Sequence, residues 1–361
     1  MDVDERVRIT KAKYPTLKEL KLGVLKGEYN DNCEYFTRGF LWKTVCMNSY
    51  KVDFLENELQ PIPKPGEAME LSHTKQDLTK EAVSSDPLST GYNSEDADNI
   101  LDVIKMDVDR LVIDPIFQKD EIKDDIIQIL YNYDKFTPYK QGFHEICGLI
   151  YLELYRDNIN NEKIKIETFN IFTSLMLSVV PNFYIEDNLI GWCISIFNKY
   201  LKLTDSALYD FFIKTHKIES QIWLIRWVRL LFMRELGISN TVKILDMFLC
   251  FDYDISKLVP FVIIISLIKI KLRLVECEDN GEVLTLLLHY PHKEFTNEEI
   301  KELVDLSIKL HKAPENKLGE YGIALNKRFH KGINWEKMKD IDRVRMELRL
   351  QRKVRGMLKM K

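Results

Sequence analysis

Residues 100–111 read ILDVIKMDVDRL and residues 143–154 read FHEICGLIYLEL, and in both stretches apolar residues recur every three or four positions. This spacing places the apolar side chains on one face of an α-helix. Comparable patterns occur at about 7–50, 163–181, 185–202, 219–236, 240–250, 258–275, 281–289 and 297–312. No β-type alternation and no repeat of fixed length stands out. We therefore predict an all-α fold, a compact multi-helix bundle.

The composition agrees with this prediction. Hydrophobic residues make up 45% and charged residues 30% of the 361 residues, which is the balance of a globular chain with a sizeable core. Glycine and proline contribute only 14 and 11 residues, too few for a turn-rich sandwich or propeller. The net charge of -4 argues against a nucleic-acid-binding body.

Two segments depart from the helical pattern. Residues 56–99 are polar, acidic and rich in Ser, Pro and Gly, so they are expected to form a loop insertion. Residues 321–361 hold thirteen Lys and Arg against four Asp and Glu, so the end of the chain is basic. Within it, 335–361 has the spacing of a basic amphipathic helix. Such a helix either contacts an anionic membrane or an acidic protein, or caps the bundle as a solvated helix.

The expected compartment is the cytoplasm. The six cysteines are widely spaced without a CxxC pair, which is typical of a reducing environment. The first fifteen residues, MDVDERVRITKAKYP, carry charges where a signal peptide needs an apolar segment. The longest uncharged apolar run, 258–268, is too short for a membrane span.

Common catalytic signatures are absent. The chain has no GxGxxG, GxxxxGK[ST], GxSxG or HExxH, so it is not expected to hold a nucleotide of its own. His289 and His292 flank a Tyr-Pro pair, but no Cys or acidic ligand accompanies them in a helical frame. A helix-end loop is the better interpretation, and no metal site is expected.

The first informative segment is IKMDVDR at 104–110. In it Asp107 lies three residues before Arg110, and Asp114 lies four residues after the arginine. Residues at these separations are neighbours on a helix surface, so an ion pair with the arginine is the simplest expectation.

The second segment is YKQG at 139–142. It follows Thr137 and Pro138, a pair that can cap and open a helix, so Gln141 is expected in a first helical turn. Arg110 and Gln141 are 31 positions apart, which leaves room for one helix and its two turns. Antiparallel packing would then bring the two side chains to one rim.

The third segment is RWVRLLFMRE at 226–235. Its Trp227 and Phe232 are most simply anchors in the core.

Together these segments resemble the TBC domain of Rab GTPase-activating proteins, whose motifs IxxDxxR, YxQG and RWxxxxFxRE occur here in that order. Supporting matches are RGFLW at 38–42, DPLS at 86–89 and VLTLLLHYP at 283–291. The resemblance implies an all-helical TBC domain over 38–313 with the loop insertion at 56–99. Residues 1–37 would form an N-terminal helical extension, and 314–361 a basic helical tail.

The resemblance also implies a function, which is to accelerate GTP hydrolysis by a GTP-bound Rab-type GTPase with two residues given in trans. Arg110 is then the arginine finger, restrained by Asp107. Gln141 stands in for the glutamine of the GTPase, with Tyr139 and Gly142 in support. The residues of the remaining motif positions are structural: Arg38, Trp42, Ile104, Arg226, Trp227, Phe232, Arg234 and Glu235. GTP and Mg²⁺ belong to the partner, so the chain needs no cofactor of its own. Such a protein regulates vesicle traffic from the cytoplasm, peripherally on Golgi or endosomal membranes.

The chain departs from the family pattern at several places. Leu111 replaces the usual Thr, Phe143 and His144 replace Met-Asn, and Leu245 replaces Trp before Asp246. No departure removes a catalytic group, although His144 changes the polarity beside the glutamine. Two alternatives remain: a catalytically inactive TBC scaffold or effector that only binds a Rab GTPase, and a helical adaptor that binds no GTPase.

Overall fold

The computed structural model describes residues 1–49, 59–62, 97–157, 161–252 and 254–332, together with residues 346 and 350. All elements in these ranges are helices, and no strand occurs among them, so the predicted all-α fold is confirmed. The helices group into two compact units. Unit 1 contains Met1–Ile9 and Thr37–Leu177, and unit 2 contains Thr10–Phe36 and Ser178–Lys361.

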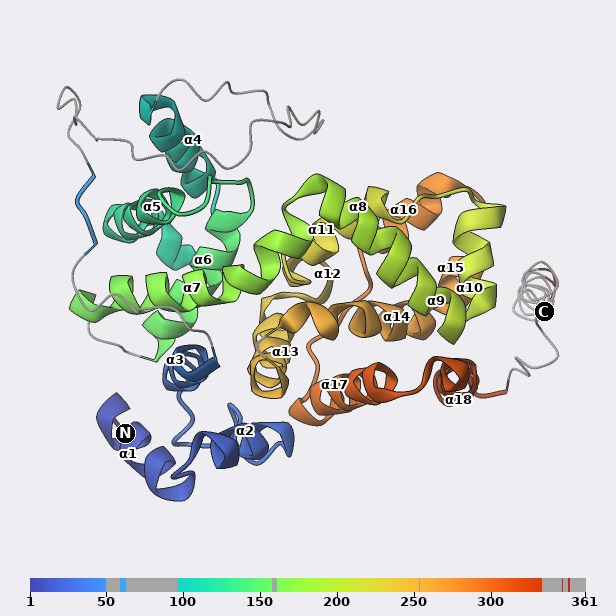
Figure 1. The fold of residues 1–361 in the computed structure, drawn as a ribbon, viewed down its shortest axis with the longest axis horizontal. Helices are drawn as coiled ribbons and strands as arrows, with labels where there is room; N and C mark the ends of the chain where they lie inside the picture. Colours follow the sequence, from blue (N-terminus) through green and yellow to red (C-terminus); the bar gives the residue numbers. More distant parts are fainter. Residues whose placement is uncertain are drawn as a thin grey trace, which may run out of the picture. The chain divides into compact units, whose positions relative to one another are not determined.

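Unit 1 is built around three helices that pack against one another, drawn teal to green in Figure 1: α4, α5 and α6. Two helices, α1 (Val3–Lys13) and α7 (Asn161–Phe183), each contribute residues to both units. The elements wholly within unit 1 are α3 (Arg38–Ser49), α4 (Ala97–Asp109), the 3-10 turn η1 (Pro115–Gln118), α5 (Asp120–Asp134) and α6 (Phe143–Arg156).

Helix α6 forms the centre of unit 1. Every residue from Phe143 to Leu154 is buried, polar ones included. A helix that is covered on all sides belongs to the interior of a domain. Helix α4 packs on α5 and α6, and its Ile104 and Val108 are fully inaccessible to solvent.

The RGFLW segment attaches α3 to the end of α6. The Arg38 guanidinium pairs with Glu153 at 2.5 Å, and the Gly39 amide donates to Asp157 Oδ2 at 2.6 Å. Burial raises the pKa of the Asp157 carboxyl, which this hydrogen bond partly opposes. Trp42, on the same helix, is almost completely buried.

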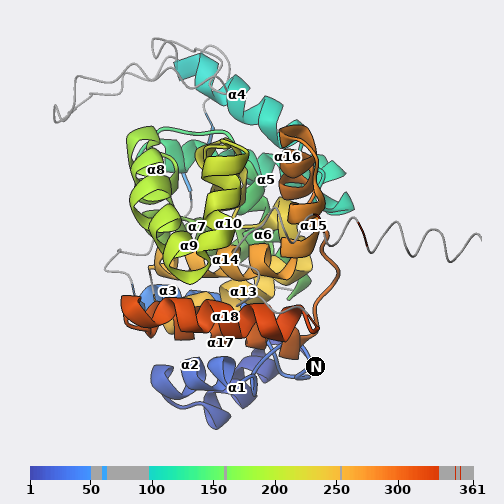
Figure 2. The same cartoon turned by 90° about the vertical axis from the view of Figure 1, so that its right-hand side faces the viewer.

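Unit 2 contains the remaining helices. In Figure 2, α17 and α18 run beside α13 and α14, which they contact. The elements are α2 (Leu17–Leu25), α8 (Glu186–Trp192), the π turn η2 (Cys193–Phe197), α9 (Asn198–Thr204), α10 (Ser206–Asp210), the π turn η3 (Phe211–Thr215), α11 (Gln221–Arg229), α12 (Met233–Leu236), α13 (Ile238–Phe251), η4 (Ile255–Lys257), α14 (Val259–Lys269), α15 (Lys271–Glu276), α16 (Asn280–Leu288), α17 (Asn297–Lys312), η5 (Glu315–Lys317) and α18 (Leu318–Phe329).

The RWVRLLFMRE segment holds α16 in unit 2. Trp227 Nε1 donates to the carbonyl of Leu287 at 3.1 Å, and the Arg226 guanidinium bonds to the carbonyl of Leu288. Arg226 also pairs with Glu235 at 2.6 Å. Burial raises the pKa of Glu235, and the arginine opposes that shift. The motif therefore satisfies two carbonyls at the end of another helix.

The helix predicted at 219–236 is interrupted. Leu231 and Phe232 have φ angles of 48° and 71°, so the chain leaves the right-handed helix between α11 and α12. Such angles are strained for side chains of this size. Phe232 is nevertheless buried, as its apolar character predicts, and Trp227 is too. Burial in the core thus outweighs the preference of these residues for a negative φ angle. The spacing of apolar residues in the sequence does not predict such a break.

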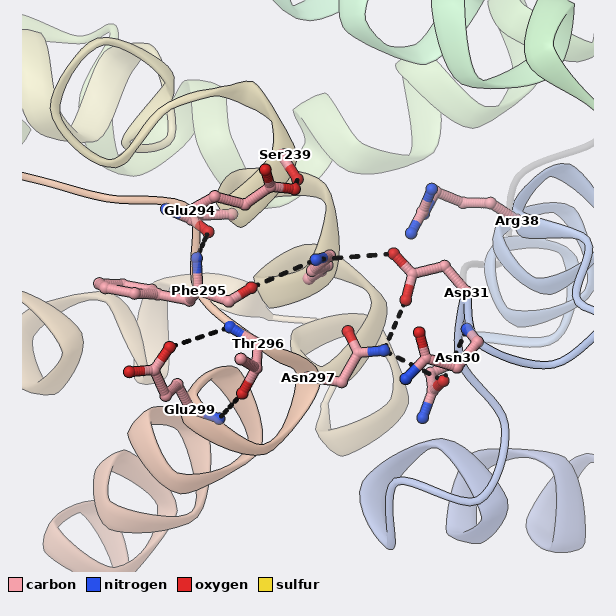
Figure 3. A network of polar contacts seen from close by, with 12 residues as sticks. Asn30, Asp31, Arg38, Ser239, Glu294, Phe295, Thr296, Asn297 and Glu299 are labelled. Carbon is pink, nitrogen blue, oxygen red and sulfur yellow. Dashed lines mark hydrogen bonds and ion pairs between the residues drawn. The ribbon is translucent and has the colours of Figure 1, made fainter.

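A polar network joins the loop after α2 to α13 and to the start of α17 (Figure 3). Asn297 Nδ2 donates to Asp31 Oδ1 at 2.6 Å and to Asn30 Oδ1 at 3.1 Å. Lys243 Nζ lies 3.7 Å from Asp31 Oδ2 and donates to the carbonyl of Phe295 at 3.3 Å. These contacts fix the N-terminal segment of unit 2 to its C-terminal helices.

The polar insertion expected at 56–99 is shorter than predicted. Leu59 is buried, and the Gln60 amide donates to Asn132 Oδ1 of α5 at 3.1 Å. Residues 97–99 already belong to α4. The described residues 59–62 are thus held against α5, because the Asn132 side chain makes hydrogen bonds with the amide and the carbonyl of Gln60. The rest of the insertion, DPLS at 86–89 included, lies outside the described residues.

The predicted basic helix at 335–361 also lies outside the described residues, apart from the exposed Met346 and Leu350. No single helix among the described residues is long and apolar enough to cross a membrane. Two helical segments meet that test only as a pair bent by 73°: Lys163–Phe183 and Glu186–Thr204.

Helix α18 contacts the end of α9 through a glycine. A Cβ on Gly322 would lie 1.7 Å from the carbonyl oxygen of Thr204, whereas one on Gly319 would lie 3.5 Å from that of Leu203. Nearby, Asn326 Nδ2 and the Lys271 ammonium both donate to the buried Asp205 carboxylate, at 2.9 and 2.6 Å. The helix is thus attached by close backbone approach and by buried polar contacts.

The two glycines give a matched test of this packing. Gly322→Ala should lower the free energy of unfolding by about 2 kcal/mol or more, since the added methyl overlaps a backbone oxygen. Gly319→Ala should be neutral or stabilising by up to about 1 kcal/mol, because alanine favours helix and fits there. Urea unfolding of both variants measures the difference. Equal effects of the two substitutions would contradict the described packing of α18.

Candidate functional site

Arg110 directly follows α4, and its side chain is exposed. Its backbone amide donates to the carbonyl of Asp107 at 3.1 Å, which closes the last turn of the helix. Among the described residues, no hydrogen bond or ion pair engages its guanidinium. The arginine therefore presents its charge and all its side-chain donors to solvent.

The expected ion pair between Asp107 and Arg110 does not form within the described part of the chain. Asp107 is buried, and its Oδ2 accepts a hydrogen bond from the Tyr139 hydroxyl at 2.8 Å. The carboxylate is therefore directed into unit 1 while the arginine side chain remains in solvent. Asp107 holds the arginine segment through the backbone instead.

The two other nearby carboxylates are also engaged elsewhere. Asp109 pairs with Lys123 at 2.9 Å, and Asp114 pairs with Arg156 at 3.1 Å. The second oxygen of Asp114 caps η1. Three acidic residues thus lie within four positions of Arg110 and have other partners, which leaves the guanidinium available.

Gln141 lies in a turn and not in a helix. Residues 138–140 are extended or irregular, and α6 begins at Phe143 with Gly142 as its N-cap. The expectation that Thr137 and Pro138 start the helix is wrong. Gly142 has a φ of 102°, a left-handed conformation that favours glycine and directs the chain into α6. This conformation explains the glycine without reference to a partner.

The side chain of Gln141 is exposed, and it has no hydrogen-bond partner among the residues that the structure describes. Its amide therefore offers both a donor and an acceptor to solvent, as a residue that orients a water molecule must.

Tyr139 is held at both ends. Its backbone amide donates to Asp134 Oδ1 at 2.7 Å, and its hydroxyl donates to Asp107 Oδ2 at 2.8 Å. Burial raises the pKa of the Asp134 carboxyl, and the bond from the amide opposes that shift. Tyr139 thus fixes the segment before Gln141 to both α5 and α4.

Phe143 belongs to an aromatic cluster beneath this turn. Its ring centroid lies 5.7 Å from Tyr133, 5.7 Å from Tyr139 and 6.1 Å from Phe172, each in an edge-to-face arrangement. Such pairs contribute about 0.5–1.5 kcal/mol beyond the area that they bury. The departure from the family pattern at Phe143 is therefore accommodated by packing.

The segment after the arginine rests on a glycine of α6. A Cβ on Gly148 would lie 2.8 Å from Leu111 Cδ2 and 3.3 Å from Ile113 Cδ1. The glycine allows residues 111–113 to approach α6 closely. Leu111, another departure from the pattern, is buried there as an apolar anchor. The sequence signal for this contact is a glycine inside a helical pattern, which usually marks close packing.

His144 is the residue of the site that the motifs do not explain. It is buried, its Nδ1 lies 3.0 Å from Tyr139 Oη, and the same nitrogen lies 3.7 Å from Asp107 Oδ2. Tyr139 therefore contacts an acidic residue of α4 and a histidine of α6. The two exposed side chains, Arg110 and Gln141, stand next in sequence to this buried cluster.

Chemically, the site combines an exposed guanidinium with an exposed amide, neither of which has a partner among the residues that the structure describes. It offers electrostatic stabilisation and orientation but no nucleophile that is activated by a base. Within the described ranges, no group of three or more His, Cys, Asp or Glu residues could hold a metal ion. The site is thus suited to act on a group that another molecule carries.

Comparison with known proteins identifies the family. The family model of the Rab-GTPase-TBC domain matches residues 35–273, more than half of the chain. The chain belongs to this family. Domains of this kind interact with Rab GTPases. The predicted domain limits, 38–313 with extensions on both sides, remain a prediction.

Two curated relatives are TBC1 domain family member 5 from Mus musculus and from Homo sapiens. Each is 24% identical to this chain over 237 residues, which is 52% of this chain. The match covers 29% and 30% of those proteins, so the chain corresponds to less than a third of their length.

The fold also matches the crystal structure of the Ypt/Rab-GAP domain of Gyp1p with a TM-score of 0.57. The sequences are 17% identical, and the match covers 86% of this chain and 99% of that one. At this identity the likeness supports the all-helical TBC fold of the chain and leaves the roles of single residues to its own geometry.

Proposed function

We propose that this TBC protein is a GTPase-activating protein, which speeds GTP hydrolysis by a Rab-type small GTPase with Arg110 and Gln141 supplied in trans. One observation carries the proposal. Both side chains are exposed and without partners among the described residues, although buried hydrogen bonds hold the backbone beside each of them. A surface side chain without a function rarely needs a buried hydrogen bond to hold the segment that carries it.

The chemistry of GTP hydrolysis explains the need for arginine. Negative charge shifts toward the β,γ-bridging and γ-phosphate oxygens in the transition state, and an arginine finger accelerates the step by about 10³–10⁵. A guanidinium is always charged and binds phosphate oxygens with two directed donors. Because no ion pair engages Arg110 within the described ranges, no such pair has to break when the partner binds.

The glutamine acts on the other reactant. An amide accepts a hydrogen from the attacking water and donates to an oxygen of the phosphate, which fixes the direction of attack. Preorganised groups of this kind lower the barrier because little reorganisation accompanies the reaction. The hydrogen bond between Asp107 and Tyr139 supplies that preorganisation for both fingers.

The GTP and Mg²⁺ of this reaction belong to the partner GTPase. By switching off a GTP-bound Rab, the protein would regulate vesicle traffic from the cytoplasmic side of Golgi or endosomal membranes. A scaffold that binds the GTPase without stimulating it is the alternative, and the experiments below separate the two.

Two exposed apolar side chains lie close to the fingers in sequence. Val112, two residues after Arg110, is 69% exposed, and Phe136, five residues before Gln141, is 68% exposed. Apolar and aromatic side chains at such positions suit the centre of a protein interface. We assign them to the face that contacts the GTPase.

Replacing Arg110 tests the first finger. Arg110→Ala and Arg110→Lys should each lower stimulated hydrolysis about 10²-fold or more, since neither alanine nor an ammonium reproduces the planar fork. Phosphate release from a panel of Rab-family GTPases measures the rate, with Arg8→Ala, an exposed arginine of the first helix, as the control. Full stimulation by Arg110→Ala would exclude this arginine as the finger.

Replacing the partner's glutamine tests the second finger. A Rab GTPase whose own catalytic glutamine is changed to leucine should remain sensitive to the wild-type protein, because Gln141 orients the water. The same GTPase should be insensitive to the Gln141→Ala variant. If the glutamine-deficient GTPase no longer responds to the wild-type protein, the water is oriented by the GTPase itself.

A charge on the proposed contact face tests docking. Val112→Asp should raise the KM for the GTP-loaded GTPase about tenfold while kcat changes little, because a buried unpaired carboxylate weakens binding. Ile323→Asp on α18, which also places an aspartate at an exposed β-branched residue, serves as the control and should leave both constants unchanged. A fall in kcat alone would assign Val112 to the reaction and not to docking.

A further inference from the structure

The buried cluster of Asp107, Tyr139 and His144 contains a hydrogen bond whose direction follows from the chemistry of its partners. Tyr139 Oη lies 2.8 Å from Asp107 Oδ2 and 3.0 Å from His144 Nδ1. All three side chains are buried, with exposed fractions of 8%, 7% and 6% for Tyr139, Asp107 and His144. Each contact therefore forms in an environment where an unsatisfied polar atom is costly.

The phenol has one hydrogen to give. An ionised carboxylate only accepts hydrogen bonds, so the tyrosine hydrogen points to Asp107. The contact between the phenol oxygen and His144 then needs a hydrogen from the imidazole. Both the neutral tautomer protonated on Nδ1 and the imidazolium carry that hydrogen, whereas the tautomer protonated only on Nε2 does not.

We propose that His144 is a positioning residue for both fingers, acting as an Nδ1–H donor to Tyr139 in a directed chain from His144 through Tyr139 to Asp107. These two hydrogen bonds link the first turn of α6, the segment before Gln141 and the last turn of α4, which precedes Arg110. The assignment of Nδ1–H as the donor follows from the two contacts of the Tyr139 hydroxyl and from the carboxylate, which only accepts. The effect on catalysis rests on the proposed function.

The direction of these hydrogen bonds predicts that an apolar side chain cannot replace His144. Without the histidine donor, the phenol oxygen loses its hydrogen bond from α6, and the hold on Tyr139 beside Asp107 is weaker. The finger segments then lose one of their shared restraints. A displacement of the order of 1 Å at a catalytic group lowers a rate by up to about 10²-fold.

Asparagine provides the matched conservative variant. Its Nδ2 is two bonds from Cβ, the same separation as Nδ1 of histidine, and it carries hydrogens to donate. His144→Asn should therefore keep the link, whereas His144→Leu, of similar bulk, removes the donor. Tyr139→Phe removes the hydroxyl, and with it both this link and the hydrogen bond to Asp107, and keeps the ring in place.

The first measurement is of the proton itself. The protein has seven histidines, so selective ¹⁵N-histidine labelling gives few signals, and the His144→Asn spectrum identifies those of His144. Wild-type His144 should show a protonated Nδ1, and in Tyr139→Phe these signals should shift because the acceptor is gone. An unprotonated Nδ1 in the wild-type protein would overturn the proposal.

The second measurement is of stimulated hydrolysis with the responsive GTPase. His144→Leu and Tyr139→Phe should each lower kcat about tenfold with KM changed by less than about threefold, and His144→Asn should stay within about threefold of wild type. The double variant His144→Leu/Tyr139→Phe should be no worse than Tyr139→Phe alone, because loss of the hydroxyl already breaks the link to His144. Full kcat in His144→Leu, or equal losses in the leucine and asparagine variants, would refute the positioning role.

Failure of the proposed function gives a different result. If no Rab-type GTPase responds to the wild-type protein, the GTPase-activating role fails while the nitrogen signals still decide the hydrogen bond. Thermal unfolding followed by circular dichroism identifies any variant that loses its fold. If a His144 variant loses its fold, the kinetic comparison uses Tyr139→Phe in its place, because this variant lacks only a single oxygen atom.

Discussion

The hydrogen bond from the Tyr139 hydroxyl to the Asp107 carboxylate is the interaction on which the site depends. It joins the last turn of α4 to the segment that leads into α6, across 32 residues of chain. Because Asp107 accepts the bond from the tyrosine, it does not pair with its neighbour Arg110, whose guanidinium has no partner in the part of the chain that the structure describes. Because Tyr139 is fixed, Gln141 follows it in a defined turn. One buried contact thus supports the segments that carry both exposed side chains.

Several features of unit 1 serve this contact. Gly142 adopts a left-handed conformation that starts α6 at Phe143, and Gly148 lets residues 111–113 approach the same helix. The aromatic cluster around Phe143 fills the space below the turn. The replaced family positions Leu111 and Phe143 are buried parts of this support, so the departures change packing and not the exposed chemistry.

The sequence predicts most of the helices because they rest on local patterns. The apolar period predicts α4 and α6, and the motifs identify the two exposed side chains. Partners of buried polar groups come from tertiary contacts, so the pairing of Asp107 with Tyr139 was not predictable from the spacing to Arg110. The helix start at Thr137 was wrong for the same reason: Asp134 and Asp107 hold Tyr139 outside any helix. The break in the helix at Phe232 likewise follows from packing, which cannot be predicted from the spacing of apolar residues.

The most direct test of this account compares how Tyr139→Phe binds two forms of the responsive Rab-type GTPase. One form carries a non-hydrolysable GTP analogue, and the other carries GDP with aluminium fluoride, which mimics the transferred phosphoryl group. If the tyrosine bond positions the fingers for the transition state, the variant should lose about tenfold or more in affinity for the second form and little for the first. Equal losses for both forms, or none for either, would contradict the claim that this bond organises the site.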